Sequence, residues 1–354
     1  MDTLQYHYPW TARPLIASAP MRLISLSHLA LAVSSAGGLG FIGAGSDCTH
    51  LHQYLLETQQ QLPHHPSLAQ NPAVLPVGIG FLLWAGEDLL KTALPLIEEF
   101  KPAAIWLFAP RSAEQLAQWS KQVRRVTAGA TRVWVQIGTV AGAVEAVRVC
   151  QPDVLVVQGN DAGGHGLEKC AGLISLVPEV GDAVAAVCAG ESVGRPVIVA
   201  AGGIVDGRGA AAALSLGASG VVMGTRYLVA PEANVALGYR RAVLEARDGG
   251  VSTARGKLYD QLRGTTDWPE EFGGRGVLNE SWFDAGRGVR FEENKRLYQE
   301  ALERGDEGWG EGARLTTYAG TGVGLVKRMQ DAAAITNEVR DDAVRHLKWT
   351  SGMM

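Results

Sequence analysis

The sequence predicts an α/β fold of the TIM type, a (β/α)8 barrel, with an appended loop-rich C-terminal segment and a terminal helix. Three observations predict this fold. Eight short apolar runs recur through residues 1–245, helical patterns separate several of them, and the composition changes after residue 245. The length of 354 residues also allows two or three domains, but (β/α)8 barrels of about 250 residues commonly grow by insertion.

The expected strands are short and almost entirely apolar, as strands buried on both faces of a parallel sheet must be. They span residues 14–17, 38–42, 74–81, 104–108, 133–137, 154–158, 196–200 and 220–223. Helical patterns of a length that suits crossover connections span residues 112–126, 140–150, 175–189 and 207–216. Because eight strands alternate with helices, a closed barrel is favoured over an open doubly wound sheet.

The C-terminal part of the chain has a different character. Residues 246–320 are rich in glycine and in charged residues, and they contain the widely spaced Trp268, Trp282 and Trp309. A helical pattern then spans residues 324–347. We therefore expect a barrel over residues 1–245 and, over residues 246–354, a loop-rich segment and a terminal helix that cover the barrel.

The composition excludes several classes of protein. Hydrophobic residues make up 47% of the chain, charged residues 19%, and the formal net charge is −4, so neither disorder nor nucleic-acid binding is expected. The uncharged stretch 23–46 contains five glycines and five serines, which argues against a membrane span. The four cysteines form no metal-binding motif and no signal-peptide pattern is evident, so we expect no metal and a cytoplasmic location.

The most distinctive loop follows the expected strand 154–158. It reads QGNDAGGHG over residues 158–166, with four glycines around Asn160 and Asp161 and with His165 near its end. Because the active sites of (β/α)8 barrels form at the C-terminal ends of the strands, His165 is a candidate general base. It could instead bind a backbone carbonyl and stiffen the loop. Asp161 could orient His165, although capping of the turn is favoured.

Two further glycine-rich loops follow the last two expected strands. Gly202 and Gly203 lie in AAGGI and lead into a helical pattern, and Gly224 and Thr225 lie in VVMGTR. Loops in these positions form the usual phosphate site of (β/α)8 barrels, because backbone N–H groups and a helix N-terminus favour an anion. Both loops could also be plain tight turns, and Arg226 could add charge or be structural.

Two other strand ends suit a flat cofactor. Ala19, Pro20 and Met21 follow the first strand, and a methionine packs adaptably on aromatic rings or in a core. Gln136 is a polar residue in the apolar run VWVQIG, and its buried amide needs a partner, which a cofactor or a barrel neighbour could supply. A phosphate site, an apolar bed and a histidine together predict the phosphorylated flavin FMN. The run GGLGFIGAG does not open a helix, so no dinucleotide-binding turn is predicted.

With these motifs the sequence resembles the nitronate monooxygenases, formerly called 2-nitropropane dioxygenases. The resemblance rests on the ordered set SAPM, AGGLGFIG, QGNDAGGHG, AAGGI, VVMGTR and YAGTGVGLV, and it runs from residue 14 to residue 326. It implies an FMN-containing TIM barrel that oxidises alkyl nitronates with O2 to a carbonyl compound and nitrite. It also implies that His165 is the base, able to deprotonate a neutral nitroalkane or to position the nitronate.

The resemblance further implies a cofactor contact for each candidate residue. The isoalloxazine would lie along Ala19, Pro20, Met21 and Gln136 and be approached by Gly164, and the phosphate would be held by Gly202, Gly203, Gly224 and Thr225. Two positions depart from many bacterial members, which have Glu where this chain has Asp161 and Asn where it has Gly80. These departures leave the substrate contacts open.

Two other functions fit the same motifs. One is another FMN barrel oxidoreductase, such as an NADH-dependent quinone reductase or an enoyl-acyl-carrier-protein reductase, although the chain has no obvious NADH-binding motif. The other is a non-enzymatic flavin-binding protein. The sequence leaves the physiological substrate and the oligomeric state open.

Overall fold

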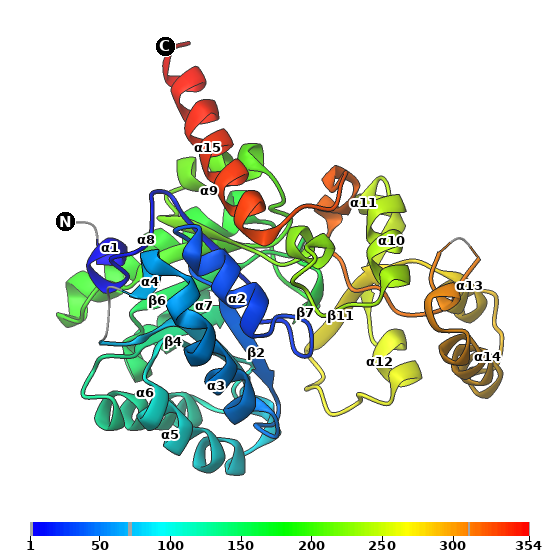
Figure 1. Ribbon diagram of the computed structural model, residues 1–354, viewed down its shortest axis with the longest axis horizontal. Helices are drawn as coiled ribbons and strands as arrows, with labels where there is room; N and C mark the ends of the chain where they lie inside the picture. Colours follow the sequence, from blue (N-terminus) through cyan, green and yellow to red (C-terminus); the bar gives the residue numbers. More distant parts are fainter. Residues whose placement is uncertain (1–2, 70–72, 311, 354) are drawn as a thin grey trace.

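A computed structural model describes residues 3–69, 73–310, 312–353 of the chain. Eight parallel strands form a nearly closed barrel in the order β1-β9-β8-β6-β5-β4-β3-β2 (Figure 1). They are β1 (Leu15–Ser18), β2 (Phe41–Gly45), β3 (Leu75–Leu82), β4 (Pro102–Phe108), β5 (Arg132–Ile137), β6 (Val154–Gln158), β8 (Val197–Ala201) and β9 (Gly220–Met223). The barrel closes beside β2, where the Ser18 N–H donates to the Leu39 carbonyl at 3.1 Å. The predicted TIM barrel is confirmed, and every expected strand lies within three residues of its predicted bounds.

Helices cover the outside of the barrel between successive strands. They are α2 (Ser27–Ser35), α3 (Leu51–Gln61), α5 (Asp88–Phe100), α6 (Ala113–Val126), α7 (Val140–Cys150), α8 (Leu173–Glu191) and α9 (Gly207–Ser215), with the short α4 (Pro66–Ala69) after α3. Three of them begin at side-chain caps, in which Ser112, Thr139 and Asp206 accept bonds from backbone N–H groups of the first turn. These caps explain why α6, α7 and α9 begin close to their predicted first residues.

The helix α15 (Ala332–Ser351) takes the place of the eighth barrel helix. It packs between α9 and α2, next to β1 (Figure 1). The prediction that this helix begins at residue 324 is wrong. The Arg226 guanidinium binds the Arg328 carbonyl and the Gln330 side chain, and the Glu232 carboxylate accepts the Ala332 N–H at 3.1 Å. These contacts hold residues 326–331 outside the helix and fix its first turn.

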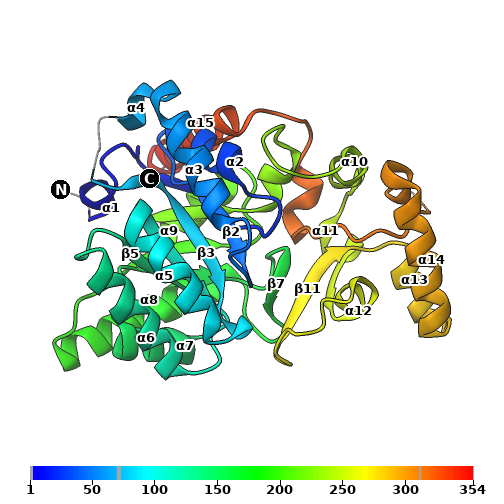
Figure 2. The ribbon, with the colours of Figure 1, turned by 60° about the horizontal axis from the view of Figure 1, so that its bottom comes forward.

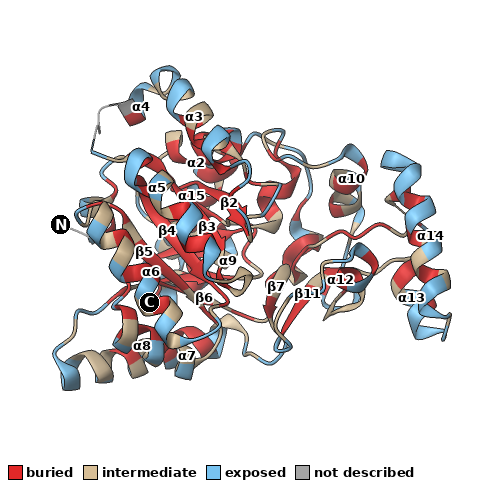
Figure 3. Ribbon diagram, turned by 90° about the horizontal axis from the view of Figure 1, so that it is seen from below, coloured by how far each residue is buried: buried red, intermediate tan, exposed pale blue. Residues whose placement is uncertain are grey.

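Side chains alternate between the two cores of the barrel. In β4, Trp106 points into the barrel interior, whereas Ile105 and Leu107 pack against the surrounding helices. The interior is closed at the N-terminal ends of the strands by α1 (Thr3–His7) and Tyr8, whose hydroxyl accepts a bond from Trp134 Nε1 at 2.7 Å. Figure 3 shows that burial is concentrated in the strands and on the inner faces of the helices. The floor of the barrel is therefore packed, and its open end lies at the opposite side.

Residues 246–320, here called the accessory lobe, lie to one side of the barrel with α10 (Leu237–Glu245) beside them (Figures 1 and 2). The lobe contains α11 (Gly249–Ser252), β10 (Thr253–Gly256), α12 (Leu258–Arg263), β11 (Phe272–Val277), α13 (Glu280–Gly286) and α14 (Phe291–Glu303). Its strands form an antiparallel sheet in the order β10-β11-β7, in which β7 (Gly164–Leu167) comes from the loop after β6. The barrel and the accessory lobe thus share a sheet through that loop.

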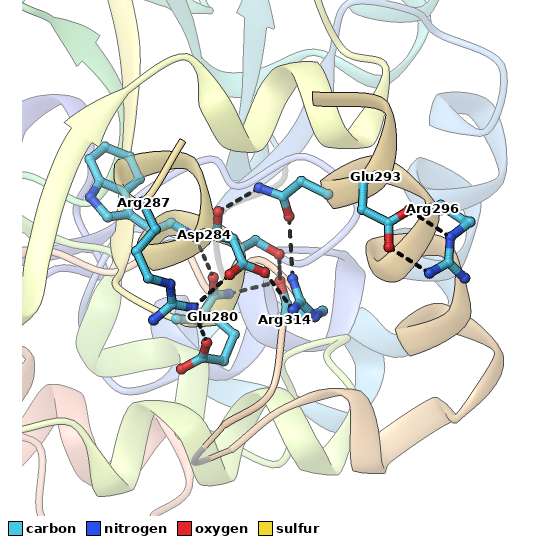
Figure 4. A network of polar contacts seen from close by, with 10 residues as sticks. Glu280, Asp284, Arg287, Glu293, Arg296 and Arg314 are labelled. Carbon is cyan, nitrogen blue, oxygen red and sulfur yellow. Dashed lines mark hydrogen bonds and ion pairs between the residues drawn. The ribbon is translucent and has the colours of Figure 1, made fainter. Parts of the chain in front are cut away.

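An ion-pair network holds the outer end of the accessory lobe (Figure 4). Asp284 binds Arg314 and Arg287, each at 2.6 Å, and Arg287 also binds Glu280 at 2.7 Å. The side chains of Asp284 and Arg314 are 10% and 15% exposed, so this pair is shielded from solvent. The network fixes α13 against the segment that precedes Tyr318.

One helix in the described part of the chain, α8, is long and apolar enough to cross a membrane by length and composition. It packs against β6, β8 and α7 as a barrel helix. The four cysteines, of which Cys48 and Cys150 are buried, form no disulfide. The described residues contain no cluster of histidine, cysteine and acidic side chains suited to a metal ion.

Candidate active site

His165 lies where the barrel and the accessory lobe meet. The chain leaves β6 at Gln158, forms the glycine-rich loop and pairs as β7 with β11, so that His165 is opposite Gly274. Gln158 Nε2 donates to the His165 carbonyl at 3.2 Å. The histidine therefore stands in a strand rather than in a free loop, because residues more than 100 positions later supply its partner strand.

The imidazole of His165 is bound by Asp260 of α12. Nε2 lies 2.9 Å from both Oδ1 and Oδ2 of the carboxylate. Oδ1 also accepts bonds from Tyr318 Oη at 2.8 Å and from Thr265 Oγ1 at 3.0 Å. The side chains of His165 and Asp260 are 15% and 6% exposed, so the pair lies in a partly dehydrated pocket where electrostatic contacts are stronger than in water.

The charge state of Asp260 follows from these contacts. Burial alone would raise the pKa of the carboxyl, but the hydrogen bonds from His165, Tyr318 and Thr265 outweigh burial and hold the pKa below its ordinary value. Burial, together with the Asp260 charge, raises the pKa of the Tyr318 hydroxyl, which therefore keeps its proton and remains a donor. Asp260 is an ionised acceptor fixed by three donors.

Aromatic rings enclose the imidazole. Trp268 stacks on His165 with ring centroids 3.9 Å apart and an interplanar angle of 4°, and Tyr318 lies at 5.3 Å. Trp268 also contacts Trp84 and Phe108, which follow β3 and end β4. The tryptophan thus joins the accessory lobe to the rim of the barrel beside His165.

Two arginines of the accessory lobe hold the backbone of the loop 158–166. Arg255 donates to the carbonyls of Gly164 at 2.9 Å and Ala162 at 2.6 Å, and Arg275 donates to that of Asn160 at 3.3 Å. Burial, and then the nearby charge of Arg275, lower the pKa of Arg255 to about 10. Both groups thus fix the shape of the loop that carries His165.

Asp161 does not contact His165. Its Oδ1 accepts the Thr321 hydroxyl at 2.9 Å, and its carbonyl accepts the Thr321 N–H at 3.0 Å. Asp161 therefore fastens the loop to the segment after Tyr318, and the carboxylate that orients His165 is Asp260.

The two loops expected to hold a phosphate lie at the ends of neighbouring strands, β8 and β9. Gly202 and Gly203 adopt φ values of +115° and +73°, which favour glycine. Within the described part of the chain, the backbone N–H groups of Gly203, Gly224 and Thr225 have no hydrogen-bond acceptor. Thr225 Oγ1 accepts the Gly320 N–H at 3.0 Å, which leaves its hydroxyl proton free to donate. These unpaired donors suit an anion such as a phosphate.

The segment Ala19–Met21 lies between these loops and β3. A side chain on Gly224 would come within 3.6 Å of Ala19 Cβ and 3.7 Å of Met21 Sδ. A Cβ on Gly80 would lie 2.2 Å from Pro20 Cβ, so Pro20 occupies the space that a side chain at position 80 would need. An asparagine, as many bacterial members have at this position, would therefore collide with Pro20 unless the backbone moved.

Gln136 and Gly164 differ in their surroundings. Gln136 Oε1 accepts a bond from Trp106 Nε1 at 2.9 Å, so a barrel neighbour satisfies its carbonyl. Gly164 has φ +65°, and a Cβ there would meet no heavy atom within 4 Å among the described residues. Open space beside a positive-φ glycine is what the close approach of a flat ligand needs.

A cavity of about 390 Å³ lies on the outer side of these loops, between α9 and α15. Two pairs of its charged residues are bound to each other, Arg208 to Asp206 and Arg328 to Glu338. The 7% exposed Arg226 lines it and is bound to Arg328 and Gln330, which gives this residue a structural role. The cavity is separate from His165.

Asp260, Trp268 and Tyr318 are residues of the site that were not predicted from the sequence. Trp268 was visible only as one of three spaced tryptophans, and Tyr318 only as the first residue of YAGTGVGLV. No local motif marks Asp260, which follows His165 by 95 residues. The predicted residues of the loops after β1, β6, β8 and β9, in contrast, do lie at one end of the barrel.

Comparison with known proteins gives consistent results. A family model described as nitronate monooxygenase matches residues 113–264. A protein of Metarhizium robertsii, "Nitronate monooxygenase npaC", is 48% identical over 339 residues, covering 95% of this chain and 92% of that protein. A nitronate monooxygenase of Neurospora crassa is 39% identical over 363 residues, covering 98% and 94%.

Solved structures share the fold at lower identity. FabK from Thermotoga maritima has a TM-score of 0.74 at 22% identity, covering 100% of this chain and 99% of that one. A nitroalkane oxidase from Streptomyces ansochromogenes has a TM-score of 0.69 at 21% identity, covering 99% and 100%. At such identities these two structures support the similarity of the fold and nothing about function.

Proposed function

The chain belongs to the nitronate monooxygenase family, and we propose that it oxidises alkyl nitronates with O2 to a carbonyl compound and nitrite, with FMN as its flavin. The observation that carries this proposal is the position of His165. Its imidazole is bound to Asp260 and lies beside Gly164, at the same end of the barrel as loops with unpaired N–H donors.

The residues present fit FMN. The free N–H groups of Gly203, Gly224 and Thr225 would bind the phosphate, and Gly202 would give their loop its positive-φ turn. Ala19, Pro20, Met21, Gly164 and Gln136 would lie along the isoalloxazine. When bound, FMN accepts the electrons of the substrate and passes them to O2.

The chain itself supplies binding, orientation and a base. We infer that His165 takes the proton from the carbon next to the nitro group when the substrate is a neutral nitroalkane. A nitronate has already lost that proton, so for this substrate His165 would position the anion as the imidazolium, whose Nδ1–H can donate to a nitronate oxygen. Trp268 and Tyr318 shield the imidazole from bulk water on the side of the accessory lobe.

The proposal also covers the binding partners, the cellular location and the division of the chain into parts. The partners are a small nitronate or nitroalkane and O2, and the location is the cytoplasm. We keep the division expected from the sequence, a barrel over residues 1–245 and an appended part over residues 246–354, with α15 of the appended part packed on the barrel as its eighth helix. The free cysteines are consistent with a reducing compartment.

The visible spectrum of the purified protein tests the cofactor and the electron donor together. We expect a flavin spectrum, release of FMN on denaturation, anaerobic bleaching by ethylnitronate and aerobic formation of nitrite. A colourless protein that does not bind FMN would contradict the cofactor assignment. Rapid anaerobic bleaching by NADH, with none by ethylnitronate, would favour a reductase of the quinone or enoyl-acyl-carrier-protein type.

A further inference from the structure

The two ring nitrogens of His165 have different surroundings. Nε2 contacts both oxygens of Asp260, whereas Nδ1 has no hydrogen-bond partner among the described residues and keeps contact with solvent. We propose that Asp260 is a positioning residue that holds the proton of His165 on Nε2 and thereby makes Nδ1 the nitrogen that accepts the substrate proton. This inference rests on the base function proposed above for His165.

The chemistry follows from what each group can donate. An ionised carboxylate only accepts hydrogen bonds, so a neutral imidazole beside Asp260 must carry its proton on Nε2 and its lone pair on Nδ1. When Nδ1 takes the proton, the C–H bond next to the nitro group breaks and an N–H bond forms. The electron pair moves onto the nitro oxygens, and the resulting imidazolium stays paired with Asp260.

The carboxylate itself cannot easily turn away. Oδ1 accepts the hydroxyls of Tyr318 and Thr265, whereas Oδ2 has His165 as its one partner in the described part of the chain. Two donors from separate segments therefore fix the rotation of the carboxylate. Two charged groups nearby bind elsewhere: Arg263 lies over the Tyr318 ring at 5.4 Å, and Arg255 binds the Gly164 carbonyl.

This asymmetry makes Asp260→Asn a sharp test. The two hydroxyl donors keep the amide oxygen at the position of Oδ1, so the amide NH2 takes the position of Oδ2 and faces His165 Nε2. The NH2 group then donates to Nε2, and the imidazole proton moves to Nδ1, which can no longer accept a proton. A tautomer reversed in this way disables a general base without removing it.

The measurement compares two substrates on the same FMN-loaded protein. We expect Asp260→Asn to lower kcat for neutral nitroethane by about 10²- to 10⁴-fold, the usual contribution of a general base, and to lower kcat for ethylnitronate, which needs no proton transfer, by a much smaller factor. Ethylnitronate turnover also shows that the variant is folded and holds its flavin. Thr265→Val, which removes one donor to Oδ1, should lower the nitroethane-to-ethylnitronate ratio by a smaller factor.

Asp284→Asn is the matched control, because Asp284 is a shielded carboxylate of the accessory lobe that is paired with arginine. Asp284→Asn should leave the nitroethane-to-ethylnitronate ratio of kcat unchanged. Asp260→Glu, which keeps a carboxylate, should be more active on nitroethane than Asp260→Asn. An equal loss on both substrates in Asp260→Asn and Thr265→Val, or no loss on nitroethane, would overturn the role of Asp260. So would a wild-type enzyme that oxidises ethylnitronate but not nitroethane. If the FMN-loaded wild type oxidises neither, the proposed function fails instead.

Discussion

The indole of Trp268 lies parallel to the imidazole of His165, with the ring centroids 3.9 Å apart. An aromatic face attracts a cation, so this contact favours the imidazolium that forms when His165 takes a proton. The same indole contacts Trp84 and Phe108 at the rim of the barrel. Trp268 therefore attaches the accessory lobe to the barrel and, in the proposed reaction, would stabilise the protonated form of His165.

Replacing Trp268 with Ala should slow the oxidation of nitroethane more than that of ethylnitronate. A cation–π contribution of about 0.5–2 kcal/mol corresponds to a roughly 2- to 30-fold loss of kcat/KM for the substrate that must be deprotonated. Trp268→Phe keeps a ring on the imidazole and should lose less. Steady-state kinetics on both substrates check this, and equal losses for the two variants would contradict the cation–π contribution.

Thr225→Val should weaken FMN binding. The substitution removes a hydroxyl donor next to the phosphate loops and keeps the shape of the side chain. A hydrogen bond to a charged group contributes about 1.5–3 kcal/mol, so the Kd for FMN should rise by roughly 10- to 150-fold. Fluorescence titration of the apoprotein with FMN measures the change.

Thr336→Val provides the control for that experiment. Thr336 is a fully buried threonine, whereas Thr225 is half-buried, and the Thr336 hydroxyl is bonded to Tyr227 and to the Ala332 carbonyl within the packing of α15. It should lower the melting temperature and leave the Kd for FMN unchanged. If both variants weaken FMN binding equally, Thr225 has no specific role at the phosphate.

Arg255→Met should destabilise the site and the fold together. The substitution removes a donor from the carbonyls of Gly164 and of the buried Ala162, and an unsatisfied buried carbonyl costs about 1–3 kcal/mol. We expect a lower free energy of unfolding in urea and a loss of activity on both substrates, because the loop that carries His165 loosens. Arg296→Met, on the exposed face of α14, should change neither. An Arg255 variant with unchanged stability would show that the loop holds its shape without this residue.

The protein should lose stability in acid partly through Asp260. Its pKa in the folded state lies below the ordinary value of 3.8, so its ionised form stabilises the fold above that pH. This contribution disappears as the pH falls through the folded-state pKa. The melting temperature of Asp260→Asn should therefore fall less steeply than that of the wild type as the pH is lowered below about 4. Parallel slopes would show that the contacts of Asp260 do not depend on its charge.

The barrel could be predicted from the sequence because its signals are local. The run 154–158 is continuously apolar and coincides with β6, and α7 begins at the cap residue Thr139. The loops Gly202–Gly203 after β8 and Gly224–Thr225 after β9 could be placed in the same way, because the strand count alone puts them at the ends of adjacent strands.

The partner of His165 could not be predicted because it depends on distant segments. Asp260 reaches the imidazole only after β7 has paired with β11 and α12 has packed beside them. None of these short elements has a strong hydrophobic periodicity from which it could be predicted. The late start of α15 has the same cause, because Arg226 and Glu232 determine it from another part of the chain.

The position of α15 has a consequence for synthesis of the chain. A nascent polypeptide that has reached residue 320 contains all eight strands and the accessory lobe but not the helix that packs between α9 and α2. Until that helix emerges from the ribosome, the apolar side chains beside β1 and β9 stay uncovered. Completion of the barrel therefore has to follow synthesis of the accessory lobe.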